Sequence, residues 1–379
     1  MIKSSAITLL AALCVAPALS LPRFALTTGT RCSACHVNPG GGGMRTQHGL
    51  TFGVGALTMA AHGDSSGDRE DFVFDPRIND NITLGADFRT QFLYLPDTGQ
   101  STFHMMTASL YGDVRLTRDI SACVRFDLVN TGYGVWSGPE VYVLARVLPG
   151  RWYIKGGDFL PAYGTRIDDH TGYTRGGDIR PAPGSSGLPG LLFVPNYKDI
   201  GLEIGGAAGN LEIAAGIFNG SGNAGRLDFR DGKAFTARLE YAFAAGGANM
   251  IVGSSGYVFD AYRMGGFHAG IGTETFALYG EVDFRRNRIA GDFTIDSSPD
   301  AMAAFAAAEY RVSRGVWATA KYDIFDPARG SSSDEFTRIT LGLELFPVPF
   351  IELRPQFRIA SEHPSVGNNS ALLQLHAWF

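Results

Sequence analysis

The sequence predicts an all-β protein, a transmembrane antiparallel β-barrel of about 16 strands that follows a short N-terminal segment. The first observation is a composition of 49 Gly, 26 Phe and 14 Tyr, which is typical of outer-membrane barrels. The second is that no apolar run long enough for a helical membrane span follows residue 20. The third is a repeated alternation of apolar and charged residues along the chain.

The alternation is clear in the segment 275–285. Every second residue there is apolar or glycine, and the residues between them include Glu281, Asp283 and Arg285. The same pattern returns in 233–243, 336–346 and 349–360. A soluble strand with one wet face could show it once, but repetition is typical of a barrel whose outer face meets lipid. We expect ion pairs in the lumen among Asp87, Arg89, Asp113, Arg115, Arg125, Asp127, Glu203, Arg238, Glu240, Glu281, Asp283, Arg285, Lys321 and Asp323, with the Cys123 thiol on the same face.

Sixteen segments fit such strands, an even number as expected for a bacterial barrel. They are 81–94, 102–117, 120–130, 139–148, 151–159, 198–208, 210–218, 233–243, 248–258, 264–273, 274–286, 301–312, 315–325, 336–346, 349–360 and 370–379. Short connections belong to the periplasmic side, and the long ones at 161–197, 219–231 and 287–300 are expected outside. Within the first of these, Asp168-Asp169-His170 could bind metal cations, although a solvated loop is the simpler interpretation.

Both ends of the chain indicate export to the outer membrane of a Gram-negative bacterium. Residues 1–20 carry Lys3, an apolar run from 6 to 16 and small residues at the end, as a secretory signal peptide does. The last residues place Leu373, Leu375, Ala377 and Phe379 at alternate positions, which resembles the C-terminal assembly signal of outer-membrane proteins. Outer-membrane lipid and the barrel assembly machinery are therefore expected partners. A net charge of −5 gives no basis for nucleic-acid binding.

The expected domains are a signal peptide at 1–20, a haem segment at 21–76 and a barrel at 77–379. The middle segment contains Cys32-Ser33-Ala34-Cys35-His36, a C-x-x-C-H run. In an exported protein this run is the attachment signature of haem c. Two thiols at this spacing bond one porphyrin, and the adjacent imidazole ligates its iron. So small a segment rarely forms its own core, so we expect it to enter the periplasmic mouth and partly plug the barrel.

The alternatives for this motif are a disulfide or half of a zinc site, but no second Cys pair completes a zinc site. The motif therefore predicts that Cys32 and Cys35 attach haem c and that His36 is the proximal iron ligand. Covalent attachment also implies the haem maturation machinery as a partner. For the distal ligand, Met44 is the first candidate, because a flexible glycine run separates it from the motif. His48 is the alternative candidate, and a barrel residue or an open position completes the set.

The run Leu21-Pro22-Arg23-Phe24-Ala25-Leu26-Thr27-Thr28-Gly29, followed by the haem motif, resembles the leading segment of the fused monohaem cytochrome–porin family. Its best-known members are outer-membrane ferrous-iron oxidases of bacteria. The resemblance implies one N-terminal haem, a barrel of about sixteen strands, and electron passage between an extracellular redox substrate and a periplasmic c-type cytochrome. The chain departs from the iron oxidases at 38–45, where their segment bearing Phe-Pro and Phe-Gly-Arg is replaced by a glycine run. A sister group with another donor or acceptor would fit this departure.

Two functions from different classes follow. In the first, the protein conducts electrons through one covalent haem between an extracellular donor or acceptor, such as ferrous iron, and periplasmic cytochromes. In the second, it is a diffusion porin for small solutes whose haem-bearing segment acts as a gate or sensor. No catalytic dyad stands out among the charged residues. The one enzymatic activity that the sequence suggests is that of a ferrous-iron:cytochrome oxidoreductase.

Overall fold

A computed structural model describes residues 23–59, 74–129, 139–166, 169, 171–177, 190–191, 197–220, 227–228, 232–289, 295–331, 334–363, 365 and 367–379. The predicted signal peptide at 1–20 lies outside the described residues. So do Asp168 and His170 of the predicted loop motif.

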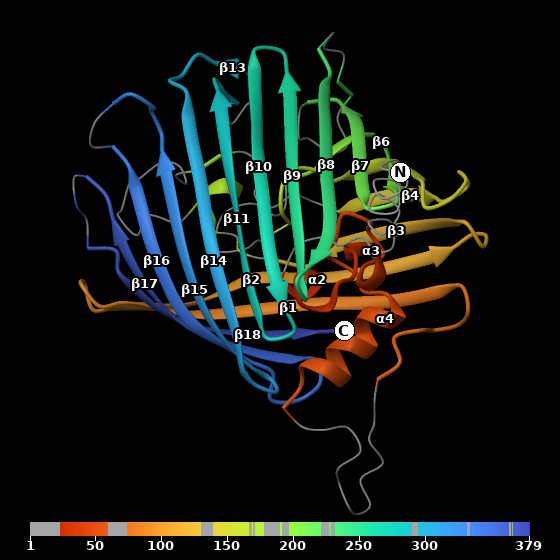
Figure 1. Ribbon diagram of the computed structural model, residues 1–379, viewed down its shortest axis with the longest axis horizontal. Coiled ribbons are helices and arrows are strands. Elements are labelled where there is room, and N and C mark those ends of the chain that lie inside the picture. The colour runs from red at the N-terminus through yellow and green to blue at the C-terminus, as the bar shows by residue number, and fades with distance from the viewer. Residues whose placement is uncertain are drawn as a thin grey trace, which may run out of the picture.

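Sixteen long strands form one closed antiparallel barrel, which confirms the predicted fold class (Figure 1). Each strand pairs with its neighbours in sequence, and β1 closes the ring against β18. The barrel strands are β1 Ile82–Leu95, β2 Gln100–Arg115, β3 Ile120–Asp127, β4 Glu140–Ala145, β5 Tyr153–Phe159, β6 Asp199–Ala208, β7 Leu211–Phe218, β8 Ala234–Ala245, β9 Ala248–Phe259, β10 Tyr262–Thr273, β11 Phe276–Arg286, β14 Ala301–Ser313, β15 Val316–Asp326, β16 Phe336–Leu345, β17 Ile351–Ser361 and β18 Ser370–Trp378. Two short strands, β12 Arg288–Ile289 and β13 Ile295–Asp296, pair only with each other.

Helical structure in the described residues is short. It comprises α2 Arg23–Thr28, α3 Cys32–Cys35, α4 Gln47–Phe52, a π-helix η1 Gly53–Leu57 and a 3₁₀ turn η2 Tyr173–Arg175. In the part of the chain that the structure describes, no helix has the length and apolar character needed to cross a membrane.

The alternation of apolar and charged residues in the sequence decides which side chains face lipid. Along β11, Leu278 is 44% exposed, whereas Glu281 and Asp283 are 4% and 0% exposed. The apolar residues therefore point outward and the charged residues point into the lumen, as the alternation predicts. A closed sheet with an apolar outer face and a polar interior is the form in which β-strands span an outer membrane.

Many of the predicted ion pairs of the lumen are present, although Arg115 and Arg285 form none among the described residues. Arg89 Nε lies 3.1 Å from Asp87 Oδ1, and Lys321 Nζ lies 2.8 Å from Asp323 Oδ1. The buried Cys123 thiol donates a hydrogen bond to Asp113 across 3.1 Å. These pairs satisfy the polar groups that the barrel removes from water.

The connections define two ends. Two-residue turns at 209–210, 246–247, 274–275 and 314–315 lie at one end, which we call the periplasmic end because short turns face the periplasm in such barrels. The opposite, extracellular end carries the long connections, but it also has short turns at 96–99 and 260–261. Asp260 adopts a positive φ of 52°, which closes a two-residue turn there. The alternation of short and long connections is therefore less strict than the sequence suggests.

Leu341 on β16 tests the assignment of the outer face. It is 50% exposed and pairs with Phe357 of β17. Leu341→Arg should lower the free energy of unfolding in lipid vesicles by about 2–4 kcal/mol, the cost of a guanidinium near the bilayer midplane. Denaturant titration followed by tryptophan fluorescence measures this change. Glu274→Arg, in an exposed periplasmic turn, is the matched control and should be close to neutral. Equal effects of the two substitutions would contradict the orientation.

Candidate functional site

Residues 23–59, called here the N-terminal segment, dock on the inner wall at the periplasmic end. Helix α2 contacts β9, β10 and β11, and Asn249 Nδ2 of β9 donates to the Leu26 carbonyl across 2.7 Å. At the other end of the segment, Arg314 of the β14–β15 turn donates to the carbonyls of Thr58 and Gly55 at 2.9 and 2.7 Å. The segment lies beside the C-terminus of the chain (Figure 1). Both of its ends are therefore anchored to the barrel.

Arg23 is the strongest electrostatic anchor of the segment. It is 6% exposed, and its guanidinium pairs with Glu309 of β14 at 2.8 Å and with Glu344 of β16. Burial alone would lower the pKa of Arg23, but the two carboxylates outweigh it and raise the pKa. The side chain therefore remains charged, and it links α2 to two strands of the wall.

Apolar packing completes the docking. Phe24, Phe52 and Leu57 of the segment pack against Trp317 of β15 and against Phe346. The rings of Phe24 and Trp317 meet edge to face, with centroids 6.2 Å apart. Aromatic pairs of this geometry stabilise by about 0.5–1.5 kcal/mol beyond the area they bury.

The haem motif forms one helical turn, which the rest of the segment clamps from one side. The Thr46 backbone N–H donates to the Cys35 carbonyl at 2.9 Å, and the Thr46 hydroxyl donates to the Ala34 carbonyl at 2.5 Å. Helix α4 then crosses α3 so closely that a Cβ on Gly49 would lie 2.2 Å from the Cys35 oxygen. Only glycine permits this approach. The turn between the two helices passes through Gly41 to Gly43, which all have positive φ.

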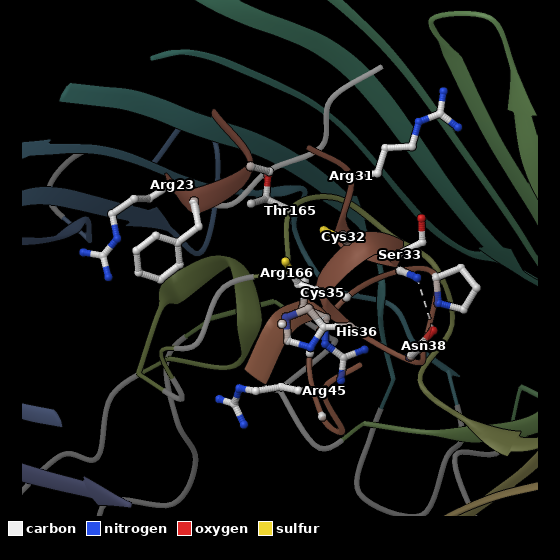
Figure 2. Close-up of a pocket in the computed structure, with 18 of the residues that line it drawn as sticks. Arg23, Arg31, Cys32, Ser33, Cys35, His36, Asn38, Arg45, Thr165 and Arg166 are labelled. Carbon is white, nitrogen blue, oxygen red and sulfur yellow. Dashed lines mark hydrogen bonds between the residues drawn. The ribbon is translucent and has the colours of Figure 1, made fainter. Parts of the chain in front are cut away.

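The motif faces a cavity of about 810 Å³ inside the barrel. Cys32, Cys35 and His36 all line this cavity (Figure 2), and both cysteines are free thiols. The remaining lining comes from the rest of the N-terminal segment, from the barrel wall and its turns, and from the connection between β5 and β6. The volume is within the range of about 300–1,000 Å³ that is common for cofactor and ligand sites. The structure thus brings the three predicted attachment and ligand residues to one chamber.

The two candidate distal ligands lie in different places. His48 is exposed and lines the same cavity as His36. Met44 is only 7% exposed and belongs to a hydrophobic cluster with Val37 and Tyr111, and it is not among the described residues that line the cavity. In the described residues, no group of three or more His, Cys, Asp or Glu side chains could hold a metal ion by itself.

The described part of the long connection between β5 and β6 folds into the lumen, which differs from the sequence expectation of an external loop. We call its residues 160–166, 169 and 171–177 the inner loop. The Thr165 N–H donates to Glu281 at 2.6 Å, and Arg175 Nη1 lies 3.0 Å from Asp283 Oδ2. Asp169 pairs with Lys321 at 2.9 Å. Asp169 is therefore a lumenal residue and not part of a solvated outer loop.

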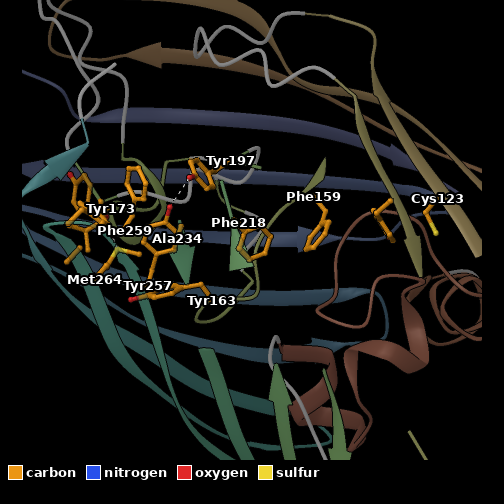
Figure 3. Packing of buried hydrophobic residues seen from close by; sticks show 14 of the residues in the cluster. Cys123, Phe159, Tyr163, Tyr173, Tyr197, Phe218, Ala234, Tyr257, Phe259 and Met264 are labelled. Atoms are coloured by element: carbon orange, nitrogen blue, oxygen red, sulfur yellow. Dashed lines mark hydrogen bonds between the residues drawn. The ribbon is translucent and has the colours of Figure 1, made fainter. Parts of the chain in front are cut away.

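The inner loop is held by both charge and aromatic packing. Burial alone would raise the pKa of Asp169, but Lys321 and Arg358 hold it well below its ordinary range. Tyr163 and Tyr173 of the loop join Phe218, Tyr257 and other wall residues in one buried cluster (Figure 3). These tyrosines were the available sequence signal, since an external loop seldom needs large apolar side chains.

Sequence reasoning also missed the arginines that surround the motif. Arg45 stacks on Trp378 of β18 with its guanidinium carbon 4.0 Å from the ring centroid. Arg166 of the inner loop reaches the glycine turn, where a Cβ on Gly42 would lie 2.3 Å from its Nε. Neither contact is visible in any local pattern, because each joins residues far apart in the chain.

Comparison with solved structures places the barrel among outer-membrane porins. A porin refined at 1.8 Å is 15% identical with a TM-score of 0.53, and 79% of this chain and 100% of that chain are covered. OmpF of Salmonella typhi in complex with daunomycin is 12% identical with a TM-score of 0.53, covering 79% and 98%. An anion-selective porin from Comamonas acidovorans is 15% identical with a TM-score of 0.52, covering 79% and 99%. No protein-family model matches the sequence, and no curated protein matches it either. The chain therefore has the 16-stranded fold of outer-membrane porins.

The Cys35 thiol gives a pH-dependent test of the site. Burial raises the pKa of Cys35, and the nearby Arg45 only partly offsets this. The thiolate, which is the reactive form, should therefore appear only above the pH at which an exposed cysteine ionises. In chain produced without haem attachment and carrying Cys32→Ser and Cys123→Ser, the alkylation rate should rise with a midpoint above that of a cysteine peptide. Adding Cys35→Ser should abolish the signal, and a midpoint at or below the peptide value would refute the half-buried placement of Cys35.

Proposed function

We propose that this protein is an outer-membrane cytochrome–porin, in which one haem c bound to Cys32 and Cys35 carries electrons between an extracellular redox partner and a periplasmic c-type cytochrome. One observation supports this above others: the two free thiols and His36 line a single cavity inside the barrel. A disulfide or a lone zinc ligand pair would require no chamber.

The residues present fit a covalent porphyrin. The one-turn helix α3 carries both thiols, and the His36 N–H donates to the Cys32 carbonyl at 2.8 Å, which sets the histidine directly after the turn. Haem c would supply a one-electron iron couple at this position. The chain would attach it through Cys32 and Cys35, ligate its iron through His36, and shield it with the inner loop and the wall.

The location of the segment suits exchange with the periplasm. Residues 23–59 are anchored to periplasmic turns at Gly209 and Arg314. A soluble carrier could approach that end, while the inner loop and its aromatic cluster narrow the lumen on the extracellular side of the cavity. The barrel is thus partly filled from both directions, which favours a redox centre held in a narrowed lumen.

The diffusion porin is the second candidate function, and it rests on the porin fold together with a cavity lined by charged side chains. The two candidates predict different behaviour in intact cells. An electron conduit changes the absorbance of its haem when an extracellular one-electron donor is added, whereas a porin supports solute uptake without such a change.

Removal of both thiols tests haem attachment. Cys32→Ala with Cys35→Ala should abolish covalent haem, measured by haem stain after denaturing electrophoresis and by visible absorbance, in cells with a working haem maturation apparatus. The barrel should still form, seen as heat-modifiable mobility, because neither thiol belongs to a strand. Cys123→Ala is the matched control and should retain haem. Wild-type protein without covalent haem would refute the proposed function.

The distal ligand is tested by two single substitutions. Because His48 lines the cavity and Met44 packs in the hydrophobic cluster, His48→Ala should change the visible spectrum of the oxidised haem and its reduction potential. Met44→Ala should leave the spectrum unchanged and reduce thermal stability. The opposite result would assign the iron to Met44, which then would turn from its cluster toward the cavity.

A further inference from the structure

The cavity surface is strongly basic although the chain is acidic overall. Its lining includes 14 arginine and lysine residues and 6 aspartate and glutamate residues. The whole chain carries a formal net charge of −5. Positive charge is therefore gathered in the lumen.

The carboxylates of the lining are already neutralised. Each of the six lies in an ion pair with a basic side chain. The pairs are Arg23 with Glu309 and Glu344, Arg31 with Glu212, Arg89 with Asp87, Arg354 with Glu352, and Lys321 with Asp169. Among the described residues, every carboxylate of the lining is therefore paired with a basic side chain.

Two lining cations, Arg238 and Lys321, pair with carboxylates that lie behind them in the wall. The side chain of Arg238 is 15% exposed, whereas its partner Glu240 is 0% exposed. Lys321 is 16% exposed and Asp323 is 1% exposed. The positive ends of these pairs reach the cavity, and the negative ends are covered.

Three lining arginines have no carboxylate within ion-pair distance among the described residues: Arg146, Arg151 and Arg166. Arg146 donates to the Val37 carbonyl at 3.3 Å, and Arg166 lies against the glycine turn at Gly42. Arg151 belongs to the β4–β5 turn at the periplasmic end. Burial lowers the pKa of Arg31, and the nearby Arg151 lowers it further. All three therefore lie near the N-terminal segment, and Figure 2 shows Arg166 in the cavity that Cys35 and His36 line.

We propose that Arg146, Arg151 and Arg166 make the cavity selective for anions, and that the small redox partner entering it is negatively charged. Rings of arginine and lysine select anions in pores, and a cleft of one sign raises the local concentration of the opposite ion. Small carboxylates, oxyanions and anionic metal chelates are the fitting class, whereas a hydrated divalent cation is repelled. The second half of the proposal rests on the proposed function.

The first experiment measures ion selectivity and needs no haem. The protein is inserted in a planar bilayer under a KCl gradient, and the reversal potential is recorded for the wild type. Chloride should permeate better than potassium, and the triple variant Arg146→Gln, Arg151→Gln, Arg166→Gln should lower the permeability ratio at least about twofold. Arg118→Gln is the matched control, since Arg118 lies in a periplasmic turn but does not line the cavity. Cation preference in the wild type would overturn the proposal.

The same recording with Cys32→Ala and Cys35→Ala identifies the anion that the arginines hold. Anion preference in both loaded and haem-free protein supports a diffusing anion. Preference in the haem-free variant alone would assign the arginines to the propionates of the haem and overturn the proposal. A wild type that carries no haem but still prefers anions would refute the proposed function and leave the anion selectivity standing.

The second experiment uses haem-loaded protein and two one-electron donors of opposite charge, ferrous EDTA and hexaammineruthenium(II). Each donor would lose one electron as the ferric haem gains one. Stopped-flow absorbance measures the rate at which the haem is reduced. For each donor, the rate with the triple variant is compared with the rate with the wild type, so the different driving forces of the two donors cancel. At low ionic strength the triple variant should slow ferrous EDTA about tenfold and leave the cationic donor no slower, and salt should reduce this difference. An equal effect on both donors would overturn the assignment.

Discussion

Closure of the barrel is the constraint on which the other features depend. In lipid every backbone N–H and C=O must find a partner within the protein, so the first and last strands have to meet. They do so through the β1–β18 pairing, and Phe379 exchanges backbone hydrogen bonds with Ala86 at 3.2 Å. Once the ring is closed, successive side chains must face lipid and lumen in turn. The charged residues therefore have only the interior available to them, and there they need partners.

The need for partners explains why two segments outside the barrel strands fold into it. Arg23 enters between Glu309 and Glu344, and Arg175 enters between Glu281 and Asp283. Breaking a buried pair by removing one member costs about 3–5 kcal/mol, because an uncompensated charge remains. The wall thus supplies the core that a segment as short as 23–59 cannot build by itself.

The last strand also takes part in the site. Trp378 lies beneath the Arg45 guanidinium, and a Cβ on Gly53 would lie 2.0 Å from its ring. The docking surface of the N-terminal segment is therefore complete only when β18 is in place. The cavity is bounded by that segment, the inner loop and the wall, so no single element defines it.

The sequence by itself determined the strand count, the outward and inward faces, and the position of the C-x-x-C-H motif. Each of these is a local property: an alternation along β11, or a spacing of three residues from Cys32 to Cys35. Only the tertiary structure decided that the inner loop enters the lumen, that His48 but not Met44 lines the cavity, and that Arg166 lies beside the motif. These features depend on pairs such as Arg175 and Glu281, which are 106 residues apart. A charge pattern shows that a partner is needed, and the closed ring of strands selects which distant residue provides it.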